Sequence, residues 1–169
     1  MALELNGTTG VSLVQDGVIT NANLPAGSVL QVVQGSTNTE VSVTTGTYTD
    51  SGLSASITPS SSSSKILVIV NQNMVNDRDT TLVESALKLL RNTTDIIEWN
   101  DHVFRVDSGG ATSVKHNGLW SFSYLDSPST TSSTTYKIQG KPLSTADNGL
   151  VRFQWANQYS LITLMEIAG

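Results

Sequence analysis

Hydrophobic and polar residues alternate with the two-residue period of a β-strand along most of the chain after residue 27. In residues 52–58, Leu53, Ala55 and Ile57 fall on one face and serines on the other. Similar runs, separated by turn-forming residues about every ten positions, predict strands at residues 28–34, 39–50, 65–70, 96–99, 119–125, 135–140, 151–155 and 161–167. This spacing is typical of a β-sandwich, and we predict an all-β, jelly-roll-like sandwich over residues 27–169.

Large aromatic residues at alternate positions indicate which strand faces are buried. One face of the strand at residues 119–125 carries Trp120, Phe122 and Tyr124. One face of the strand at residues 151–155 carries Val151, Phe153 and Trp155. Aromatic side chains bury the largest apolar areas. We therefore expect Trp120 and Trp155 to lie in the core.

Five consecutive serines, residues 60–64, run directly into the aliphatic segment KILVIV. Serine runs often mark linkers between domains. Here strand patterns adjoin the run on both sides, without a charge block or a Gly/Pro cluster. We interpret residues 58–64 as a loop within one sandwich. Since aliphatic residues occupy both faces of residues 65–70, we expect both faces to be covered.

Residues 82–90 fit two periodicities. Leu82, Val83, Ala86, Leu87 and Leu90 form a helical face, whereas Val83, Leu87 and Leu89 form one face of a strand. Periodicity alone slightly favours a helix. The sequence that follows, RNTTDIIEW, resembles a turn into a strand, so we predict a strand over residues 86–90.

The composition argues against several classes of protein. Serine and threonine together account for 44 of 169 residues, and only 14% are charged. The absence of cysteine excludes disulfides and thiolate metal sites. The net charge of -5 and the scattered cations argue against nucleic-acid binding. No apolar run is long enough to insert into a membrane.

The first 26 residues differ from the rest of the chain. No Lys or Arg precedes Lys65, and Tyr48 is the only aromatic residue before Trp99. We expect residues 1–26 to form an extended N-terminal arm that lies on a partner, because its few apolar side chains cannot form a core. The candidate anchoring residues of this arm are Leu3, Leu5, Val11, Leu13, Val14 and Ile19.

Several short motifs contain residues that could catalyse a reaction or bind a metal ion. The segment VDSGGA at residues 106–111 resembles the nucleophile segment of serine proteases, but His102 and His116 lack the expected context, and a Gly-Gly turn explains it better. The pair Asp77 and Asp79 lacks the further ligands of a calcium site, and we expect a solvated loop tip.

Residues 98–107 gather Glu98, Asp101, His102 and Asp107, which we interpret as a polar loop in preference to a cation site. Trp99, at a strand end, is the best candidate for a glycan-contacting aromatic residue. No base–nucleophile pair can be assembled, so we expect no enzymatic activity, no cofactor and no bound metal.

Five segments carry a resemblance to known proteins: GSVLQVVQ, TYTDSGLSASITPSSSSSKILVIVNQN, ALKLLR, SYLDSPSTTSSTTYKIQGK and the final ITLMEIAG. Over residues 27–169 the chain is similar to a family of β-rich virion proteins of marine and freshwater tailed phages. Members of that family are described as tail-fibre or minor structural proteins. The resemblance implies a jelly-roll-like homotrimer on a virus particle and transfers no catalytic residues. The arm lies outside it.

The C-terminal strand is apolar on both faces, which suggests a subunit contact on one of them. Either face could serve, so the interface candidates are Leu161, Ile162, Leu164, Met165 and Ile167.

The leading hypothesis is a trimeric virion appendage of the tail-fibre type. Its arm would bind baseplate, tail or capsid proteins, and it could contact host surface polysaccharide. The alternatives are a capsid decoration protein or head fibre and, less favoured, a carbohydrate-binding module.

Overall fold

The structure is a computed structural model that describes residues 24–79, 82–107, 109 and 113–169. Its strands are β1 (Val29–Thr37), β2 (Val41–Val43), β3 (Thr49–Ile57), β4 (Lys65–Arg78), β5 (Leu82–Arg91), β6 (Thr94–Asp107), β7 (Val114–Asp126), β8 (Thr134–Pro142), β9 (Leu150–Phe153) and β10 (Ser160–Ile167). Two 3-10 turns, η2 (Ala146–Asn148) and η3 (Trp155–Asn157), flank β9. None of the described segments is a helix long and apolar enough to cross a bilayer.

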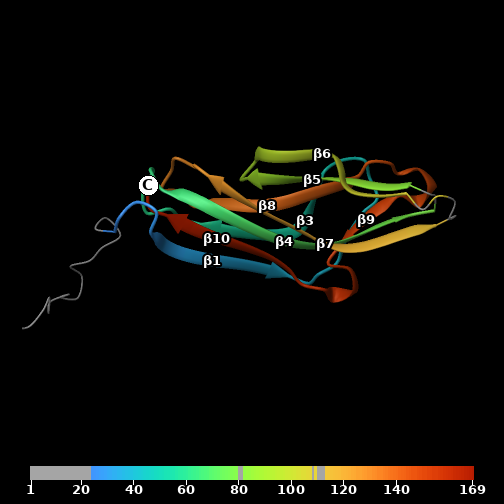
Figure 1. Ribbon diagram of the computed structural model, residues 1–169, viewed down its shortest axis with the longest axis horizontal. Coiled ribbons are helices and arrows are strands. Elements are labelled where there is room, and N and C mark those ends of the chain that lie inside the picture. Colours follow the sequence, from blue (N-terminus) through green and yellow to red (C-terminus); the bar gives the residue numbers. More distant parts are fainter. Residues whose placement is uncertain (1–23, 80–81, 108, 110–112) are drawn as a thin grey trace, which may run out of the picture.

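The strands form two antiparallel sheets that pack face to face (Figure 1). In the first, which we call sheet A, β1, β10, β4 and β7 lie side by side, and β9 and β2 continue the sheet beside the second half of β4. The second, sheet B, has the order β3, β8, β5 and β6. The predicted all-β sandwich is confirmed, and so is the strand over residues 86–90, which belongs to β5.

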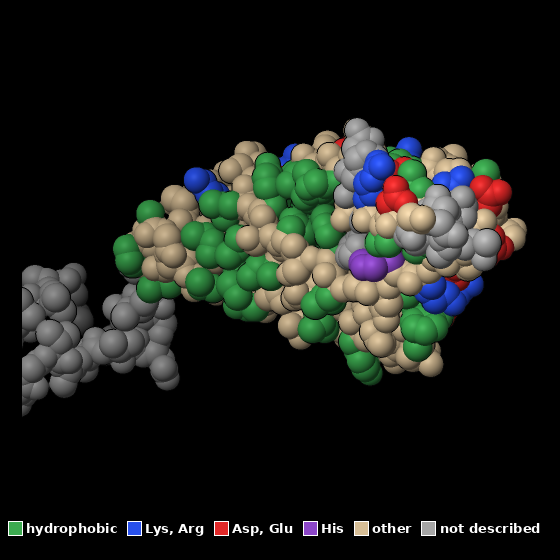
Figure 2. All heavy atoms as spheres, turned by 45° about the vertical axis from the view of Figure 1, so that its right-hand side comes forward, with side chains coloured by type: hydrophobic (Ala, Val, Ile, Leu, Met, Phe, Trp, Pro, Cys, Tyr) green, Lys and Arg blue, Asp and Glu red, His purple; other side chains and the backbone are tan. Residues whose placement is uncertain are grey.

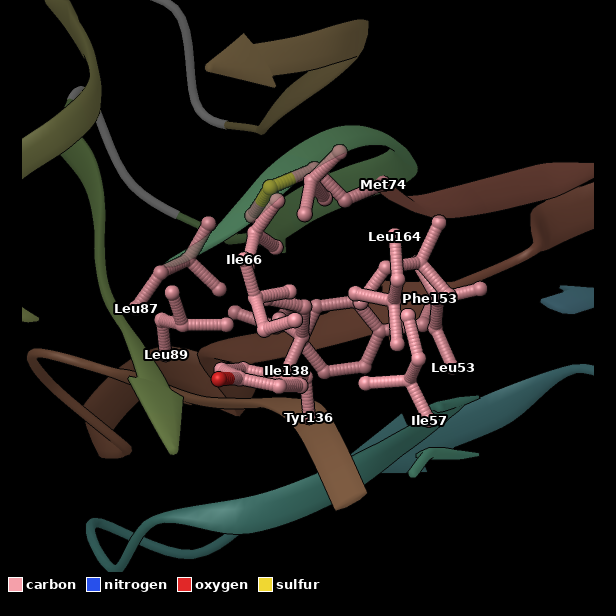
Figure 3. Close-up of a cluster of buried hydrophobic side chains, with 14 of the residues drawn as sticks. Leu53, Ile57, Ile66, Met74, Leu87, Leu89, Tyr136, Ile138, Phe153 and Leu164 are labelled. Atoms are coloured by element: carbon pink, nitrogen blue, oxygen red, sulfur yellow. The ribbon is translucent and has the colours of Figure 1, made fainter. Parts of the chain in front are cut away.

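Inward side chains of both sheets form one core. In β4, Ile66, Val68 and Val70 are completely buried, whereas Leu67 and Ile69 on the opposite face are half-buried. Figure 3 shows the largest members of the cluster, among them Leu53, Ile57, Ile66, Met74, Leu87, Leu89, Tyr136, Ile138, Phe153 and Leu164. Each fully buried aliphatic side chain contributes roughly 1.5–3 kcal/mol, so this cluster is the main attraction between the sheets.

Tyr136 brings a hydroxyl group into this core. The hydroxyl donates a 2.7 Å hydrogen bond to Asp126 of β7, and Arg91 of β5 lies 2.9 Å from the same carboxylate. Burial, followed by the bond to Asp126, raises the pKa of Tyr136 above its ordinary value. The hydroxyl therefore stays protonated and links β8 of sheet B to β7 of sheet A.

The serine run is the connection between the two layers. β3 of sheet B ends at Ile57 and β4 of sheet A begins at Lys65, with the five serines between them. This is a loop inside one sandwich, as the flanking strand patterns predicted.

The predicted strand over residues 151–155 is too long. β9 ends at Phe153 because Gln154 adopts a left-handed conformation, with φ of 54°. Its amide is completely buried and, with nitrogen toward the carbonyls, donates to Thr39 and Ser51 at 3.0 and 2.9 Å. The turn carries Trp155 out of the core. Its ring is half-buried and lies 5.4 Å from the Lys115 ammonium group.

Gly140 of β8 permits close packing between the sheets, and we predict that an added methyl group destabilises the fold. A Cβ atom there would lie 2.5 Å from Leu87 Cδ2 and 2.6 Å from Phe153 Cζ. Gly140→Ala should lower the free energy of unfolding by about 1–3 kcal/mol, measured by chemical denaturation. Gly46→Ala is the matched control, because nothing lies within 4 Å of its Cβ position. Equal effects of the two changes would contradict this account.

Candidate functional site

The outer face of sheet A carries a row of apolar side chains that crosses four strands. The pairing registers place Val32 opposite Met165, Met165 opposite Leu67, and Leu67 opposite Leu125. Val32 and Leu125 are 56% and 47% exposed, and the two central residues are half-buried. Such a continuous row on an exposed face is a candidate contact surface.

Strand β10 divides the five interface candidates between the two faces of sheet A. Ile162 and Leu164 are completely buried in the core of the sandwich. Leu161, Met165 and Ile167 lie on the outer face and are half-buried. Only the outer set is therefore available to a partner. The sequence prediction overlooked Val32, Leu67 and Leu125, although the aliphatic residues on both faces of KILVIV were a signal for Leu67.

The outer face of sheet B has the opposite character. Three ion pairs lie on it: Lys137–Asp50 at 3.0 Å, Lys88–Asp95 at 3.0 Å and Arg105–Glu84 at 2.8 Å. The Tyr48 ring lies 4.6 and 4.5 Å from the ammonium groups of Lys88 and Lys141. Burial and the neighbouring Glu98 carboxylate raise the pKa of Tyr48 above its ordinary value, so the phenol stays neutral. This charged face suits contact with water.

Glu166 is a buried carboxylate near the end of β10, on the core side. Ser60 donates from its backbone N–H at 2.7 Å and from its hydroxyl at 2.6 Å, and the Gln31 amide donates at 2.6 Å. Burial alone would raise the pKa of Glu166, but these donors outweigh it and hold the pKa below its ordinary value. Glu166 thus fixes the serine loop against β1 and β10.

Charged side chains gather at the end of the sandwich farthest from the C-terminus (Figure 2). Asp77, placed by the sequence on a loop tip, lies within β4 and pairs with Lys115 at 3.2 Å and Arg152 at 3.7 Å. Asp79 accepts a 2.8 Å hydrogen bond from Asn148, and Arg78 pairs with Asp147 at 3.3 Å. The contacts of Arg78 and Asp79 thus join the end of β4 to the β8–β9 connection, and those of Asp77 join β4 to β7 and β9.

A small hollow lies at the same end, beside these ion pairs. Among its lining residues are Arg78, Glu84, Pro142 and Gly149. Arg78 and Glu84 already take part in ion pairs with Asp147 and Arg105. Within the described ranges, no group of three or more His, Asp or Glu side chains is arranged to hold a metal ion.

Trp99 belongs to an aromatic cluster between the sheet edges. Its half-buried ring meets Trp120 edge-on at 4.8 Å and Phe122 at 4.7 Å, and all three pack against the core. Trp99 of β6 therefore connects sheet B to β7 of sheet A. This packing explains its position without a ligand. Trp120, expected in the core, is half-buried at its margin.

Some of the sequence candidates lie outside the described part of the structure. They are the six arm residues Leu3, Leu5, Val11, Leu13, Val14 and Ile19, together with Ser108 of the DSGG segment. The side chains of Asp101 and His102 are likewise not described. No family model and no curated protein matches the chain.

The Glu166 site predicts a pH-dependent contribution to stability. A carboxyl group whose pKa falls on folding stabilises the protein above its unfolded pKa, about 4.3, and loses that contribution as pH falls through the lowered value. Glu166→Gln should lower the free energy of unfolding by about 1–3 kcal/mol at neutral pH. The difference from wild type should shrink as the pH falls below about 4.

Urea denaturation over a pH series measures this difference. The control is Glu40→Gln, since Glu40 is exposed and lies just before β2. A difference between wild type and Glu166→Gln that persists unchanged at low pH would show that the carboxylate charge contributes nothing.

Proposed function

We propose that the sandwich is a jelly roll. The supporting observation is the nesting of its strand pairs: β5 with β6, β4 with β7, β3 with β8 and β1 with β10. One long hairpin rolled into two layers has this pairing. Jelly rolls occur in viral capsid domains, lectins and cupins, so the fold narrows the function without fixing it.

We propose further that the protein is a virion structural protein, a trimeric appendage of the tail-fibre type. The main support for this proposal is the nested strand pairing. The sequence resemblance to phage virion proteins selects this role among those of jelly-roll proteins. The outer apolar residues of β10 offer the subunit contact that a trimer needs. The same assembly would serve a capsid decoration protein, so the place of attachment separates the two roles.

The two ends of the described chain support attachment at one end of the sandwich. Gly27 N–H donates to the Ala168 carbonyl at 2.8 Å, and Ala168 N–H donates to the Ser28 carbonyl at 2.8 Å. Residues before Gly27 therefore join the molecule beside its C-terminus. An arm that bound another virion protein there would leave the charged end pointing away from the particle.

Paired substitutions in β10 test the subunit contact. Met165→Asp places a charge on the outer face and should give a folded monomer. Leu164→Asp buries a charge in the core, which costs several kcal/mol, and should prevent folding. Light scattering gives the mass and circular dichroism the fold. As a control, Tyr159→Asp, at a 64% exposed residue in the turn before β10, should remain trimeric. Wild-type monomers at micromolar concentration would reject the trimer.

Deletion of residues 1–23 tests the arm. The described residues from Leu24 onward include every strand of both sheets, so the truncated protein should keep its unfolding midpoint and its oligomeric mass. Virus particles assembled with it should lack the protein, as measured by quantitative mass spectrometry of purified virions. Normal occupancy on particles would refute the role of the arm. Labelling of full-length protein on the tail or on the capsid distinguishes a fibre from a decoration protein.

A further inference from the structure

We infer that three copies of the chain pack the outer faces of sheet A around a common axis parallel to the strands. This inference rests on the trimer of the proposed function and adds which surface faces the axis and which strands meet. The contact surface extends beyond β10 to the row Val32, Met165, Leu67 and Leu125, which crosses four strands.

The distribution of charge supports a second copy as the partner. The outward positions around this row are apolar or uncharged, such as Ile69, Thr163 and Ser123, and Lys65 lies at the end of the strands. Identical faces that carried charges would repel one another when buried together. The outer face of sheet B, in contrast, carries the ion pairs of Lys137, Lys88 and Arg105. Sheet A is therefore the face suited to self-association.

The width of the face suits three copies. Four strands about 4.8 Å apart make a wall about 19 Å wide. If the edge strands of neighbouring copies keep the same spacing, three such walls enclose an axis about 7 Å from each sheet. Stacked sheets pack about 10 Å apart, so side chains from each sheet fill about 5 Å. The long side chains of Met165 and Leu67, on the two central strands, would then extend into the remaining space at the axis.

The area of the contact follows from the same dimensions. A wall about 19 Å wide and as long as the eight residues of β10 covers on the order of 500 Å² per copy. Each copy divides this face between its two neighbours, so the three faces together bury about 1,500 Å² over the three contacts, comparable in total to one standard-size interface of about 1,600 Å². The three-fold arrangement also determines which edges meet. Because rotation about the axis preserves height along it, Val32 on β1 of one copy lies beside Leu125 on β7 of the next.

Cysteine pairs test this contact cleanly because the chain contains no cysteine. The full-length variant Val32→Cys/Leu125→Cys is oxidised with copper phenanthroline and run on a non-reducing gel. Within one subunit the two positions are three strand spacings apart, about 14 Å, too far for an internal disulfide. We expect covalent trimers from the double variant and no covalent product from either single variant.

The control is Ser54→Cys/Glu98→Cys, at exposed positions on the edge strands β3 and β6 of sheet B, and it should give no covalent product. Light scattering of the unoxidised proteins shows whether the trimer of the proposed function exists, independently of which surface forms it. A trimer that is not cross-linked through Val32 and Leu125, or that is cross-linked through sheet B, overturns this inference and leaves the proposed function standing. Monomeric wild-type protein overturns both, and covalent dimers without trimers replace the three-fold contact with a two-fold one.

Discussion

The pairing of β4 on both of its edges is the constraint on which the rest of the sandwich depends. One edge pairs with β7 from Ile66 to Arg78, and the other pairs first with β10 and then with β9. Its inner face supplies three completely buried aliphatic residues to the core. A strand of fourteen residues that is held in this way fixes the register of both halves of sheet A. Among the described strands, the short β2 pairs with β9 and so depends on β4 indirectly.

The sequence predicted the strands well where one face is apolar and the other polar. Residues 52–58 are the clearest case, since Leu53 and Ile57 are buried and the serines between them exposed. The helix-like pattern in residues 82–90 was correctly assigned to a strand because a turn and a second strand follow it. Gln154 could not be predicted, since its left-handed conformation depends on buried carbonyl groups from residues far away in the sequence.

The candidate site was predicted only in part, for a similar reason. Apolar residues on both faces of β10 indicated a second buried surface, but not which face belongs to the core. That choice depends on Ile162 and Leu164 meeting residues of sheet B, and such contacts leave no local pattern. The neighbours of Met165 in the row come from β1, β4 and β7, far apart in the sequence, so the row exists only through the sheet register.

Glu166 explains why the two surfaces of β10 can differ so sharply. A carboxylate on the core side would normally oppose folding, because burial penalises its charge. Here the serine loop crosses the end of the sandwich and Ser60 supplies two of the donors that satisfy it. The hydrogen bonds that Glu166 needs are thus made inside the subunit. The outer residues Met165 and Ile167 have no charged side chain that would need such partners. The outer face can then remain apolar, which is the condition that the proposed three-fold contact needs.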